Sequence, residues 1–492
     1  MKKKNKKVGL ISGVFDIIHV GHIYHLKEAK KYCDKLYVSL TSNKFVNKGN
    51  DRPVFNLKER KIILESISEV DKVIINNNPN NVKNILKIKP DLYIKGKDYK
   101  DLNHKENKAL KNEINAIKKV GGKFLTTTSK VHSTSKILNE NFNFLDHNIK
   151  NFIKKKLNPL SLQRKLKNNL FKKNKNIHLL LGEPIIDIYK YVKVLGKSQK
   201  SNVISTSMIN EKKYKGGIFL PTKFFSNFFK NNISMLFLSK NEKMNFNKRY
   251  FKNLKIFNIN SNLIKTIKKI RFIDAYSNTR LFQYNINENE CRPDKDDLNK
   301  YYLKLKQIIK KNIDVTVFDY GYGYFEDQTL KLINNNFKKM NINCQSNSSN
   351  HGFNLISKYI GAKILCVDEL EFRLFVQDKN KNIYELLLNN IKKISKYKTF
   401  IVTMGSNGCY IVNKNKIFYV PTIIKTSKDT TGCGDIFFSA YIYFDSLKCF
   451  DHFETGFLSH IAAGLHAEND GNENIISKEL FFKTFDRILK WR

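Results

Sequence analysis

Residues 8–32 read VGLISGVFDIIHVGHIYHLKEAKKY, and this stretch decides the fold of the first part of the chain. Its first five residues form a short apolar run that is typical of a buried strand, and its last ten have the apolar spacing of a helix. Between them, Gly13 and the segment from His19 to His22 predict a turn from strand into helix. Such a helix start offers backbone N–H groups and a positive dipole end to a phosphate. The two imidazoles beside Gly21 would add donors where charge develops during a transfer reaction.

The alternation of strand and helix continues from this motif to about residue 140. Further strands are expected at 36–40, 73–75, 92–94 and 123–125, and helices at 57–67, 81–88 and 107–120. This pattern predicts βαβ units and a parallel sheet. A second α/β series begins at residue 177, with strands expected at 177–181, 235–238, 315–318, 364–367, 399–402 and 417–420. We therefore predict an α/β protein with a first domain at 1–140, a basic helical linker at 141–176 and a second domain at 177–492.

The composition narrows the classes of function. The chain has 492 residues, with 89 Lys and Arg against 44 Asp and Glu, and a formal net charge of +45. This charge suggests a nucleic-acid partner, but 79 of the basic residues are Lys and only ten are Arg. Arg is the side chain that reads phosphate and guanine with paired hydrogen bonds, so we do not expect nucleic acid as the main partner. No apolar run approaches the ~20 residues of a membrane span. Seven scattered cysteines without a CxxC pair favour a reduced, cytoplasmic protein.

Residues 428–440 read KDTTGCGDIFFSA and form the second informative motif. A turn with Gly432 and Gly434 that opens an apolar helix presents consecutive backbone N–H groups to a phosphoryl group. Asp435 follows at the helix start, where its carboxylate could accept a proton from a substrate hydroxyl. Taken alone, the motif is also compatible with a plain left-handed turn and helix cap.

The first motif resembles the cytidylyltransferase-like nucleotidyltransferases, over residues 6–140. The resemblance continues in DRPV at 51–54, LKER at 57–60, PDLYIKGKDY at 90–99 and HSTSKI at 132–137, although HSTS is also a plain helix cap. It implies a Rossmann-like fold in which a sugar phosphate attacks the α-phosphate of ATP or CTP, with Mg²⁺, and pyrophosphate leaves. His19 and His22 are the implied catalytic residues. The implied nucleotide and phosphate ligands are Gly13, Phe15, Asp16, Gly21, Arg60, Lys95, Ser133, Thr134 and Ser135.

The second motif resembles the ribokinase-like (pfkB) sugar kinases, over about residues 177–490. Supporting segments are LGEPIID at 181–187, DYGYG at 319–323, DELE at 368–371 and TMGSNG at 403–408. The resemblance implies Asp435 as the base, ATP and Mg²⁺ as cosubstrate and cofactor, and a homodimer. The implied ligands are Thr403, Gly405, Gly432, Cys433 and Gly434 for nucleotide and phosphate, Asp187, Gly216 and Gly217 for the sugar, and Glu371 for a magnesium network.

Two departures from the kinase family's pattern leave open whether the second domain has kinase activity. KGGIFLP at 215–221 keeps the two glycines of the family's substrate loop but lacks its Asn, and Asp368 stands where the family has Asn. The segment 343–354, NCQSNSSNHGFN, could hydrogen-bond a polyhydroxylated ligand or could equally be a polar loop.

Together the two resemblances predict a bifunctional enzyme that makes a nucleotide-activated sugar, for surface polysaccharide. One domain phosphorylates a sugar and the other couples a sugar phosphate to a nucleoside monophosphate. In the bifunctional heptose-phosphate kinase/adenylyltransferases the kinase half comes first, whereas here the order is reversed. The alternative is an active transferase whose kinase-like half only binds sugar or supports oligomerisation.

Overall fold

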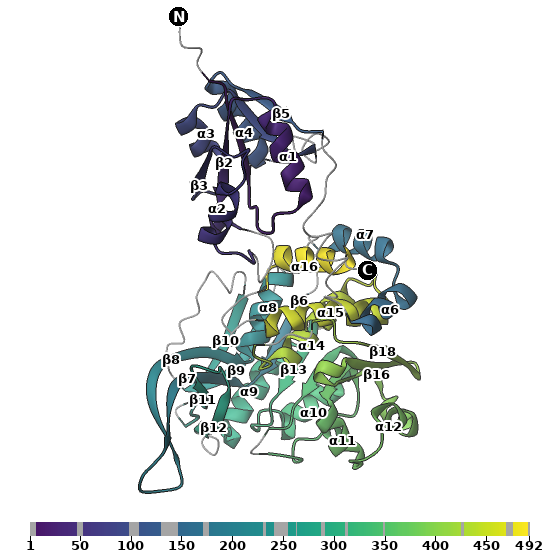
Figure 1. The fold of residues 1–492 in the computed structure, drawn as a ribbon. Coiled ribbons are helices and arrows are strands. Elements are labelled where there is room, and N and C mark those ends of the chain that lie inside the picture. The colour runs from purple at the N-terminus through teal and green to yellow at the C-terminus, as the bar shows by residue number, and fades with distance from the viewer. Residues whose placement is uncertain are drawn as a thin grey trace, which may run out of the picture. The chain divides into compact units, whose positions relative to one another are not determined.

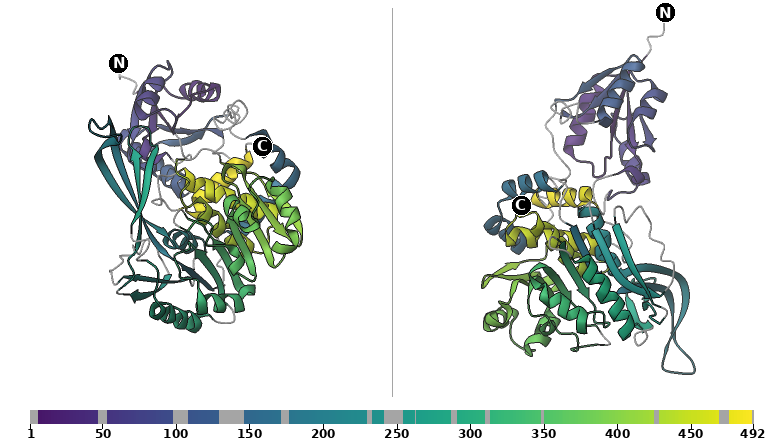
Figure 2. Two further views of the ribbon diagram at one scale, coloured as in Figure 1. Left: turned by 90° about the horizontal axis from the view of Figure 1, so that it is seen from below. Right: turned by 180° about the vertical axis from the view of Figure 1, so that it is seen from behind.

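The structure is a computed structural model, and the chain divides between residues 144 and 145 into two compact units (Figures 1 and 2). Each unit is described by itself. The residues described are 6–46, 53–97, 108–128, 146–170, 177–229, 233–240, 254–261, 263–286, 291–309, 313–347, 350–424, 428–468 and 476–490.

Unit 1 is a five-stranded parallel sheet with helices between consecutive strands. Its elements are β1 (Val8–Gly13), α1 (Val20–Lys30), β2 (Lys35–Thr41), α2 (Leu57–Glu65), β3 (Lys72–Asn76), α3 (Val82–Ile88), β4 (Leu92–Lys95), α4 (Lys108–Lys119) and β5 (Lys123–Thr126). In the strand order β3-β2-β1-β4-β5, the chain adds β2 and β3 on one side of β1 and then β4 and β5 on its other side. Ligands of such sheets bind at the carboxyl ends of the strands beside the reversal, so the fold directs attention to the ends of β1 and β4.

The apolar side chains of β1 pack on both faces of this sheet. Ile11 belongs to a cluster with residues of α1 and β2, and Leu10 to a second cluster with residues of α3 and α4. A strand that is buried on both faces reads as a continuous apolar run, which explains why residues 8–12 predicted β1 correctly.

Unit 2 is built on a nine-stranded sheet with the order β10-β9-β6-β13-β14-β15-β16-β17-β18. Its strands are β6 (Ile177–Gly182), β9 (Ile233–Lys240), β10 (Leu254–Ser261), β13 (Ile313–Asp319), β14 (Met340–Cys344), β15 (Ala362–Asp368), β16 (Tyr397–Thr403), β17 (Cys409–Asn413) and β18 (Lys416–Val420). The pairs from β10 to β16 are parallel, and β16, β17 and β18 are antiparallel.

Helices cover both faces of the nine-stranded sheet (Figure 1). On one face lie α9 (Lys295–Ile308), α10 (Asp327–Asn335), α11 (Glu369–Val376), α12 (Ile383–Asn389) and α13 (Ile391–Ile394), and their side chains join a large apolar cluster. On the other face lie α8 (Phe219–Phe229), α14 (Cys433–Ser446) and α15 (His452–Ala467), with α16 (Lys478–Lys490) beside α15. The prediction of an α/β protein with two such domains is confirmed.

A second, four-stranded sheet of unit 2 was not expected from the sequence. We call it the accessory sheet; its order is β12-β11-β7-β8. Its strands are β7 (Pro184–Lys197), β8 (Ile204–Gly217), β11 (Ile267–Asp274) and β12 (Arg280–Ile286). The hairpin of β7 and β8 projects from the rest of the unit (Figure 1). Tyr189, Tyr214 and Ile273 form a small apolar cluster in this sheet. β8 is exposed along most of its length, so its sequence has no apolar run that would indicate a buried strand.

Residues 146–170 form two helices that pack within unit 2. They are α6 (His147–Lys156) and α7 (Pro159–Asn169). Phe152 of α6 contacts the rings of Phe453 and Phe457 on α15, and Lys165 of α7 forms an ion pair with Glu454. These residues are helical, as expected, and they belong to the compact second unit; the proposed boundaries 1–140, 141–176 and 177–492 stay predictions. Across the described ranges, each helix is too short or too polar to span a bilayer.

Candidate functional site

The first predicted site lies where β1 leads into α1. His19 is the N-cap of α1, and its Nδ1 accepts a hydrogen bond from the Gly21 backbone N–H at 3.1 Å. His22 Nδ1 accepts in turn from the His19 backbone N–H at 3.4 Å, which completes a capping box. The two ring centroids are 3.9 Å apart. Because each Nδ1 accepts a hydrogen bond, the proton of each neutral ring resides on Nε2, the atom suited to donate to a phosphate oxygen.

The turn before His19 has strained backbone, which is common at functional sites. Phe15 has φ +45° although it is not a glycine, and its ring is buried. A Cβ at Gly13 would lie 2.9 Å from the Phe15 ring, so only glycine fits there. The Phe15 ring centroid lies 5.3 Å from that of His22. Gly13 and Phe15 therefore position the histidine pair, while their expected contact with nucleotide stays a prediction.

Arg60 and Asp16 lie buried beneath this turn. Arg60 donates to the backbone carbonyls of Val14, Thr41 and Phe55 at 2.6–3.0 Å. Asp16 accepts from the Phe55 backbone N–H at 3.2 Å. Burial lowers the pKa of Arg60 and the charge of Asp16 opposes this. In the structure both side chains hold the turn in place, and the phosphate contacts that the resemblance implies for them stay predictions.

Lys95 ends β4 in a buried polar network that the sequence did not reveal. Its Nζ lies 3.7 Å from Glu113 Oε2 and 5.3 Å from the centre of the Tyr93 ring. Glu113, on α4, also accepts from the Tyr93 hydroxyl at 2.9 Å, and that hydroxyl lies 2.6 Å from Ser12 Oγ at the end of β1. Burial lowers the pKa of Lys95, and Glu113 opposes this shift. The network fixes Lys95 at the reversal point of the sheet. The residues Ser133, Thr134 and Ser135 lie outside the described part of the chain.

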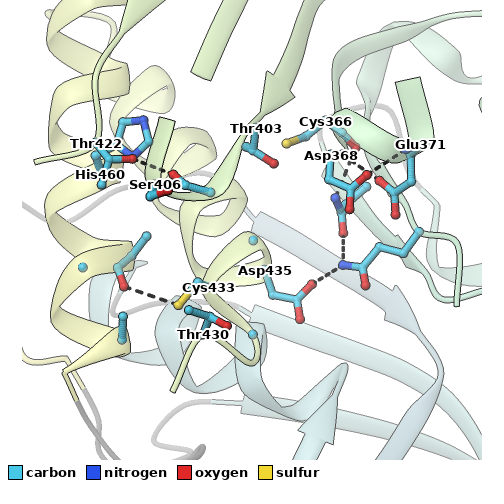
Figure 3. Close-up of a pocket in the computed structure, with 18 of the residues that line it drawn as sticks. Cys366, Asp368, Glu371, Thr403, Ser406, Thr422, Thr430, Cys433, Asp435 and His460 are labelled. Atoms are coloured by element: carbon cyan, nitrogen blue, oxygen red, sulfur yellow. Dashed lines mark hydrogen bonds between the residues drawn. The ribbon is translucent and has the colours of Figure 1, made fainter. Parts of the chain in front are cut away.

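The second predicted site surrounds a cavity of 420 Å³ in unit 2 (Figure 3). It lies at the carboxyl ends of β14, β15 and β16 and at the N-terminus of α14, which is where ligands of such sheets bind. Seven residues predicted from the sequence line it: Glu371, Thr403, Gly405, Gly432, Cys433, Gly434 and Asp435. The fold therefore brings these separate motifs to one place. Asn343, Gln345 and Ser346 line it too, so the start of the amide-rich segment belongs to the site.

Asp435 lies in the first turn of α14 and is 7% exposed. Figure 3 shows its carboxylate between the Thr430–Cys433 side of the cavity and the pair of Asp368 and Glu371. Gln345 Nε2 donates to Asp435 Oδ1 at 2.7 Å and to Asn343 Oδ1 at 2.6 Å. Burial raises the pKa of Asp435 to about 7, although the hydrogen bond from Gln345 lowers it. A carboxyl group with this pKa is well matched to a general base near neutral pH.

Gln345→Leu is expected to shift the pH profile of any reaction that uses Asp435 as a base. Gln345 stabilises the charged carboxylate, so its loss raises the Asp435 pKa further above its usual range. A hydrogen bond to a charged group contributes about 1.5 kcal/mol or more, or roughly one pH unit. The profile of kcat/KM, which falls as the base is protonated at low pH, should therefore move upward by about one unit. Thr422→Val, in the same cavity, is the control. An unmoved profile in the Gln345 variant would exclude Asp435 as the base.

The resemblance implies an anion hole in the turn before α14; residues 432–434 of this turn line the cavity, and their anion-binding role stays a prediction. Gly432 has φ +78°, in the left-handed region that favours glycine, and is the N-cap residue. Cys433 Sγ donates to the backbone carbonyls of Asp429 and Ala463 at 3.9 and 3.7 Å. Burial raises the pKa of this thiol to about 12. The thiol therefore stays protonated and faces protein carbonyls. The backbone of residues 432–434, rather than the thiol, is thus available to a ligand in the cavity. We call residues 432–435 the anion-hole turn.

Asp368 and Glu371 form the acidic side of the cavity. Asp368 caps α11, and the two side chains accept from each other's backbone N–H groups at 2.7 Å. Glu371 Oε1 also accepts from the Ser346 backbone N–H at 2.8 Å. Burial and the charge of Asp368 raise the pKa of Glu371 to about 8. Asp at position 368 thus acts as a helix cap, a role that Asn fills equally well. Among the described residues, no group of three or more His, Cys, Asp or Glu side chains is placed to hold a metal ion.

The opposite end of the cavity is less polar. Gly405 has φ +54°, and its carbonyl accepts from Thr422 Oγ1 at 2.6 Å. Thr403 Oγ1 donates to the Val367 carbonyl at 3.3 Å. Burial lowers the pKa of His460 to about 3, so this ring is neutral and lines the cavity as a weakly polar group. An aromatic base suits such a surface better than a phosphate does.

The predicted sugar ligands lie on the accessory sheet. Asp187 on β7 is 3% exposed and accepts from Arg271 Nη1 at 2.5 Å. Gly216 and Gly217 end β8 and pair with Ile185 and Pro184. Gly217 has φ +55°, and a Cβ there would lie 2.4 Å from the Glu183 carbonyl oxygen, so the backbone requires this glycine. Sugar binding by these residues stays a prediction.

Two known families match this chain, each over a different part of it. Residues 10–212 match the cytidylyltransferase-like family, and residues 233–444 match the pfkB family of carbohydrate kinases. Two separate parts of the chain are thus similar to two different families. The first match runs past the end of unit 1 as far as β8, and the second begins at β9. The pfkB match ends within α14, and so it includes the anion-hole turn and Asp435.

The curated relatives that match are bifunctional proteins named HldE. The protein of Aliarcobacter butzleri is 38% identical over 129 residues, which cover 25% of this chain and 26% of that protein. The protein of Paramagnetospirillum magneticum is 41% identical over 100 residues, 20% of each chain. The protein of Shigella flexneri is 40% identical over 101 residues, 20% of this chain and 21% of that one. The matched part thus spans about a quarter or less of each relative's length.

Solved structures resemble the fold of unit 2. Phosphofructokinase-2 from Escherichia coli in complex with substrates and products superposes with a TM-score of 0.51 at 12% identity, over 63% of this chain and 98% of that one. The same enzyme in complex with fructose-6-phosphate superposes with a TM-score of 0.50 at 11% identity, over 63% and 98%. At this identity the likeness concerns the fold alone.

Proposed function

We propose that the chain is a bifunctional enzyme that makes a nucleotide-activated sugar. Unit 1 would transfer a nucleoside monophosphate from ATP or CTP to a sugar phosphate and release pyrophosphate. Unit 2 would phosphorylate a sugar from ATP. The observation that carries the proposal is the 420 Å³ cavity, which gathers Asp435, the anion-hole turn and the acidic pair from motifs far apart in the sequence. The match to proteins named bifunctional, and to both families, supports the pairing of activities.

In unit 1 the proposed chemistry is in-line attack by a phosphate oxygen of the sugar phosphate on the α-phosphorus. The N-terminus of α1 would hold the triphosphate with its backbone N–H groups, as helix N-termini hold anions. His19 and His22 would donate from Nε2 to phosphate oxygens, where negative charge grows in the transition state. No covalent intermediate with the protein is required, since binding and electrostatic stabilisation account for this class of reaction.

In unit 2 the carboxylate of Asp435 would accept the proton of a sugar hydroxyl as it attacks the γ-phosphorus of ATP. The backbone N–H groups of the anion-hole turn would stabilise the transferring phosphoryl group. Mg²⁺ would neutralise phosphate charge. Burial raises the pKa of Glu371 and the neighbouring charge of Asp368 adds to this shift, so a cation beside the two carboxyls would stabilise their charged forms. Because both Glu371 oxygens already accept backbone hydrogen bonds, we propose that Glu371 acts on Mg²⁺ through water, and that ATP phosphates supply direct ligands.

The test is a screen of the purified chain with Mg²⁺, with ATP or CTP, against a panel of sugar 1-phosphates for pyrophosphate release. The same panel of sugars and sugar phosphates, with ATP alone, is screened for ADP release. Pyrophosphate release without ADP release would favour the second candidate, in which unit 2 only binds sugar. That candidate is motivated by the loss of the family's Asn from KGGIFLP at 215–221. All seven cysteines are free thiols, which is typical of a reducing compartment, so we propose that the enzyme is cytoplasmic.

A homodimer through the hairpin of β7 and β8 is also proposed. Its projecting part exposes apolar side chains, with Leu195, Val203 and Ile204 at 58–65% exposure. Exposed apolar surface of this kind is common at protein interfaces. We expect wild-type protein to have twice the mass of one chain in light scattering, and Ile204→Lys to have the mass of one chain. A wild-type monomer at micromolar concentration would contradict the proposal.

A further inference from the structure

The accessory sheet holds the loop that precedes the anion-hole turn. The Asp429 side chain in this loop is only 9% exposed. Its carboxylate accepts from the Tyr189 hydroxyl at 2.5 Å and from Arg280 Nη2. Arg280 Nη2 also contacts Thr431 Oγ1 at 2.5 Å, and the Thr431 backbone N–H donates to the same carboxylate at 2.8 Å. Tyr189 lies on β7 and Arg280 begins β12, so two strands of the accessory sheet hold one carboxylate.

The same contacts lead to the proposed sugar site. Asp187 and Tyr189 are two residues apart on β7, so their side chains point to the same face of the sheet. Arg271 on β11 is paired with Tyr189, donates to Asp187 at 2.5 Å, and places its guanidinium carbon 5.4 Å from the centre of the Tyr189 ring. A continuous chain of side-chain contacts therefore runs from Asp187 through Arg271 and Tyr189 to Asp429.

The opposite side of the loop is fixed by α15 through its backbone. The N–H groups of Lys428 and Asp429 donate to the Ala467 carbonyl at 2.8 and 3.2 Å, and His466 Nε2 lies 2.9 Å from the Thr431 carbonyl. These bonds hold the backbone of the loop, whereas the Asp429 carboxylate is held by Tyr189, Arg280 and the Thr431 N–H. That carboxylate lies next to the turn where a phosphoryl group would bind.

We propose that Tyr189, Arg280 and Asp429 form a latch by which the accessory sheet holds the anion-hole turn in its phosphate-binding geometry. The latch has two effects. It orients the loop that leads into Gly432, and the charge of Arg280 neutralises a carboxylate that would otherwise repel the incoming phosphoryl group. Tyr189 and Arg280 are positioning residues, because they contact the loop and not the reacting atoms. Since Asp187 lies on the same sheet face, sugar bound there would be coupled to the anion-hole turn.

The latch rests on the proposed kinase activity, so its test includes a readout that does not need turnover. Hydrogen exchange is measured on the full chain for wild type, Arg280→Met and the milder Tyr189→Phe. Amides 430–434 should exchange at least about tenfold faster in Arg280→Met, while the body of α14 is unchanged. With the acceptor found in the ADP-release screen, Arg280→Met should lower kcat by about tenfold or more and change the KM for ATP by less than about threefold.

Two further variants separate the latch from a general loss of structure. Arg292→Met breaks a surface ion pair with Glu326 in the same unit and should alter neither readout. Arg280→Met combined with Asp429→Asn should be no slower than Asp429→Asn alone, because both act through one carboxylate. Unchanged hydrogen exchange at 430–434 in Arg280→Met would overturn the latch. So would a double variant whose loss of kcat equals the product of the losses in the two single variants. If wild type transfers no phosphoryl group, the proposed function fails, and the exchange data still decide whether the sheet holds the turn.

Discussion

Asp435→Asn is expected to lower the kcat of the proposed kinase reaction by about 10²–10⁴-fold, the range that a positioned general base contributes. Asn keeps the size of the side chain and can still meet Gln345, but it cannot accept a proton from the substrate. The substitution also removes a buried carboxyl whose pKa is raised to about 7 by burial, so the thermal midpoint should not fall. The measurement is ADP formation under saturating ATP and acceptor, together with thermal unfolding.

Two controls accompany this variant. Asp445→Asn changes a second carboxyl on α14, ten residues later, whose pKa burial also raises. It should leave phosphoryl transfer within about twofold of wild type, since Asp445 does not line the cavity. Pyrophosphate release by unit 1 should be unchanged in both variants. Undiminished ADP formation in Asp435→Asn would remove Asp435 from the mechanism.

His19→Ala is expected to lower pyrophosphate release by about 10²–10³-fold, as the loss of one transition-state donor does. The effect arises because the imidazole Nε2 no longer stabilises charge on the phosphate. The variant also loses the N-cap of α1, which costs about 1 kcal/mol of stability. Rate and unfolding must therefore be measured on the same preparation, with ADP release by unit 2 as the internal reference.

His19→Asn separates catalysis from capping. Asn is among the best N-cap residues and can accept the Gly21 N–H in place of the imidazole. We expect this variant to recover the stability that His19→Ala loses while its pyrophosphate release stays about 10²-fold or more below wild type. Recovery of full activity in His19→Asn would show that His19 serves only to start the helix.

The sequence predicted the elements whose side chains are buried on both faces. β1, β15 and β16 are mostly apolar in sequence, and each is followed by a motif at its carboxyl end, so the position of both candidate sites followed from the order of strands and helices. The β1–α1 turn was visible because Gly13 ends the apolar strand and a glycine between two histidines follows at the start of the helix. The structure adds that Phe15 has a positive φ, which no pattern of residue types indicated.

Three parts of the structure were beyond prediction because they depend on contacts distant in sequence. Gln345 meets Asp435 across 90 residues, and a glutamine inside an amide-rich segment has no local signal for that role. Glu113 is one of several polar residues on α4, and only the sheet order brings it to Lys95. In the accessory sheet, β8 is exposed along most of its length, so residues 204–217 show no buried apolar pattern that would indicate a strand. The latch on Asp429 joins this sheet to a loop 149 residues from Arg280.

The buried guanidinium of Arg60 has a consequence for how the basic composition is interpreted. Of the 89 lysine and arginine residues in the chain, 79 are lysine and only ten are arginine. Arg60 meets three carbonyls and one amide oxygen, and Arg373 binds Glu369 and two loop carbonyls at once. A single ammonium cannot reproduce such a planar set of donors. Arg60→Lys and Arg373→Lys would therefore not be conservative substitutions, because each would leave several hydrogen-bond acceptors without their donor.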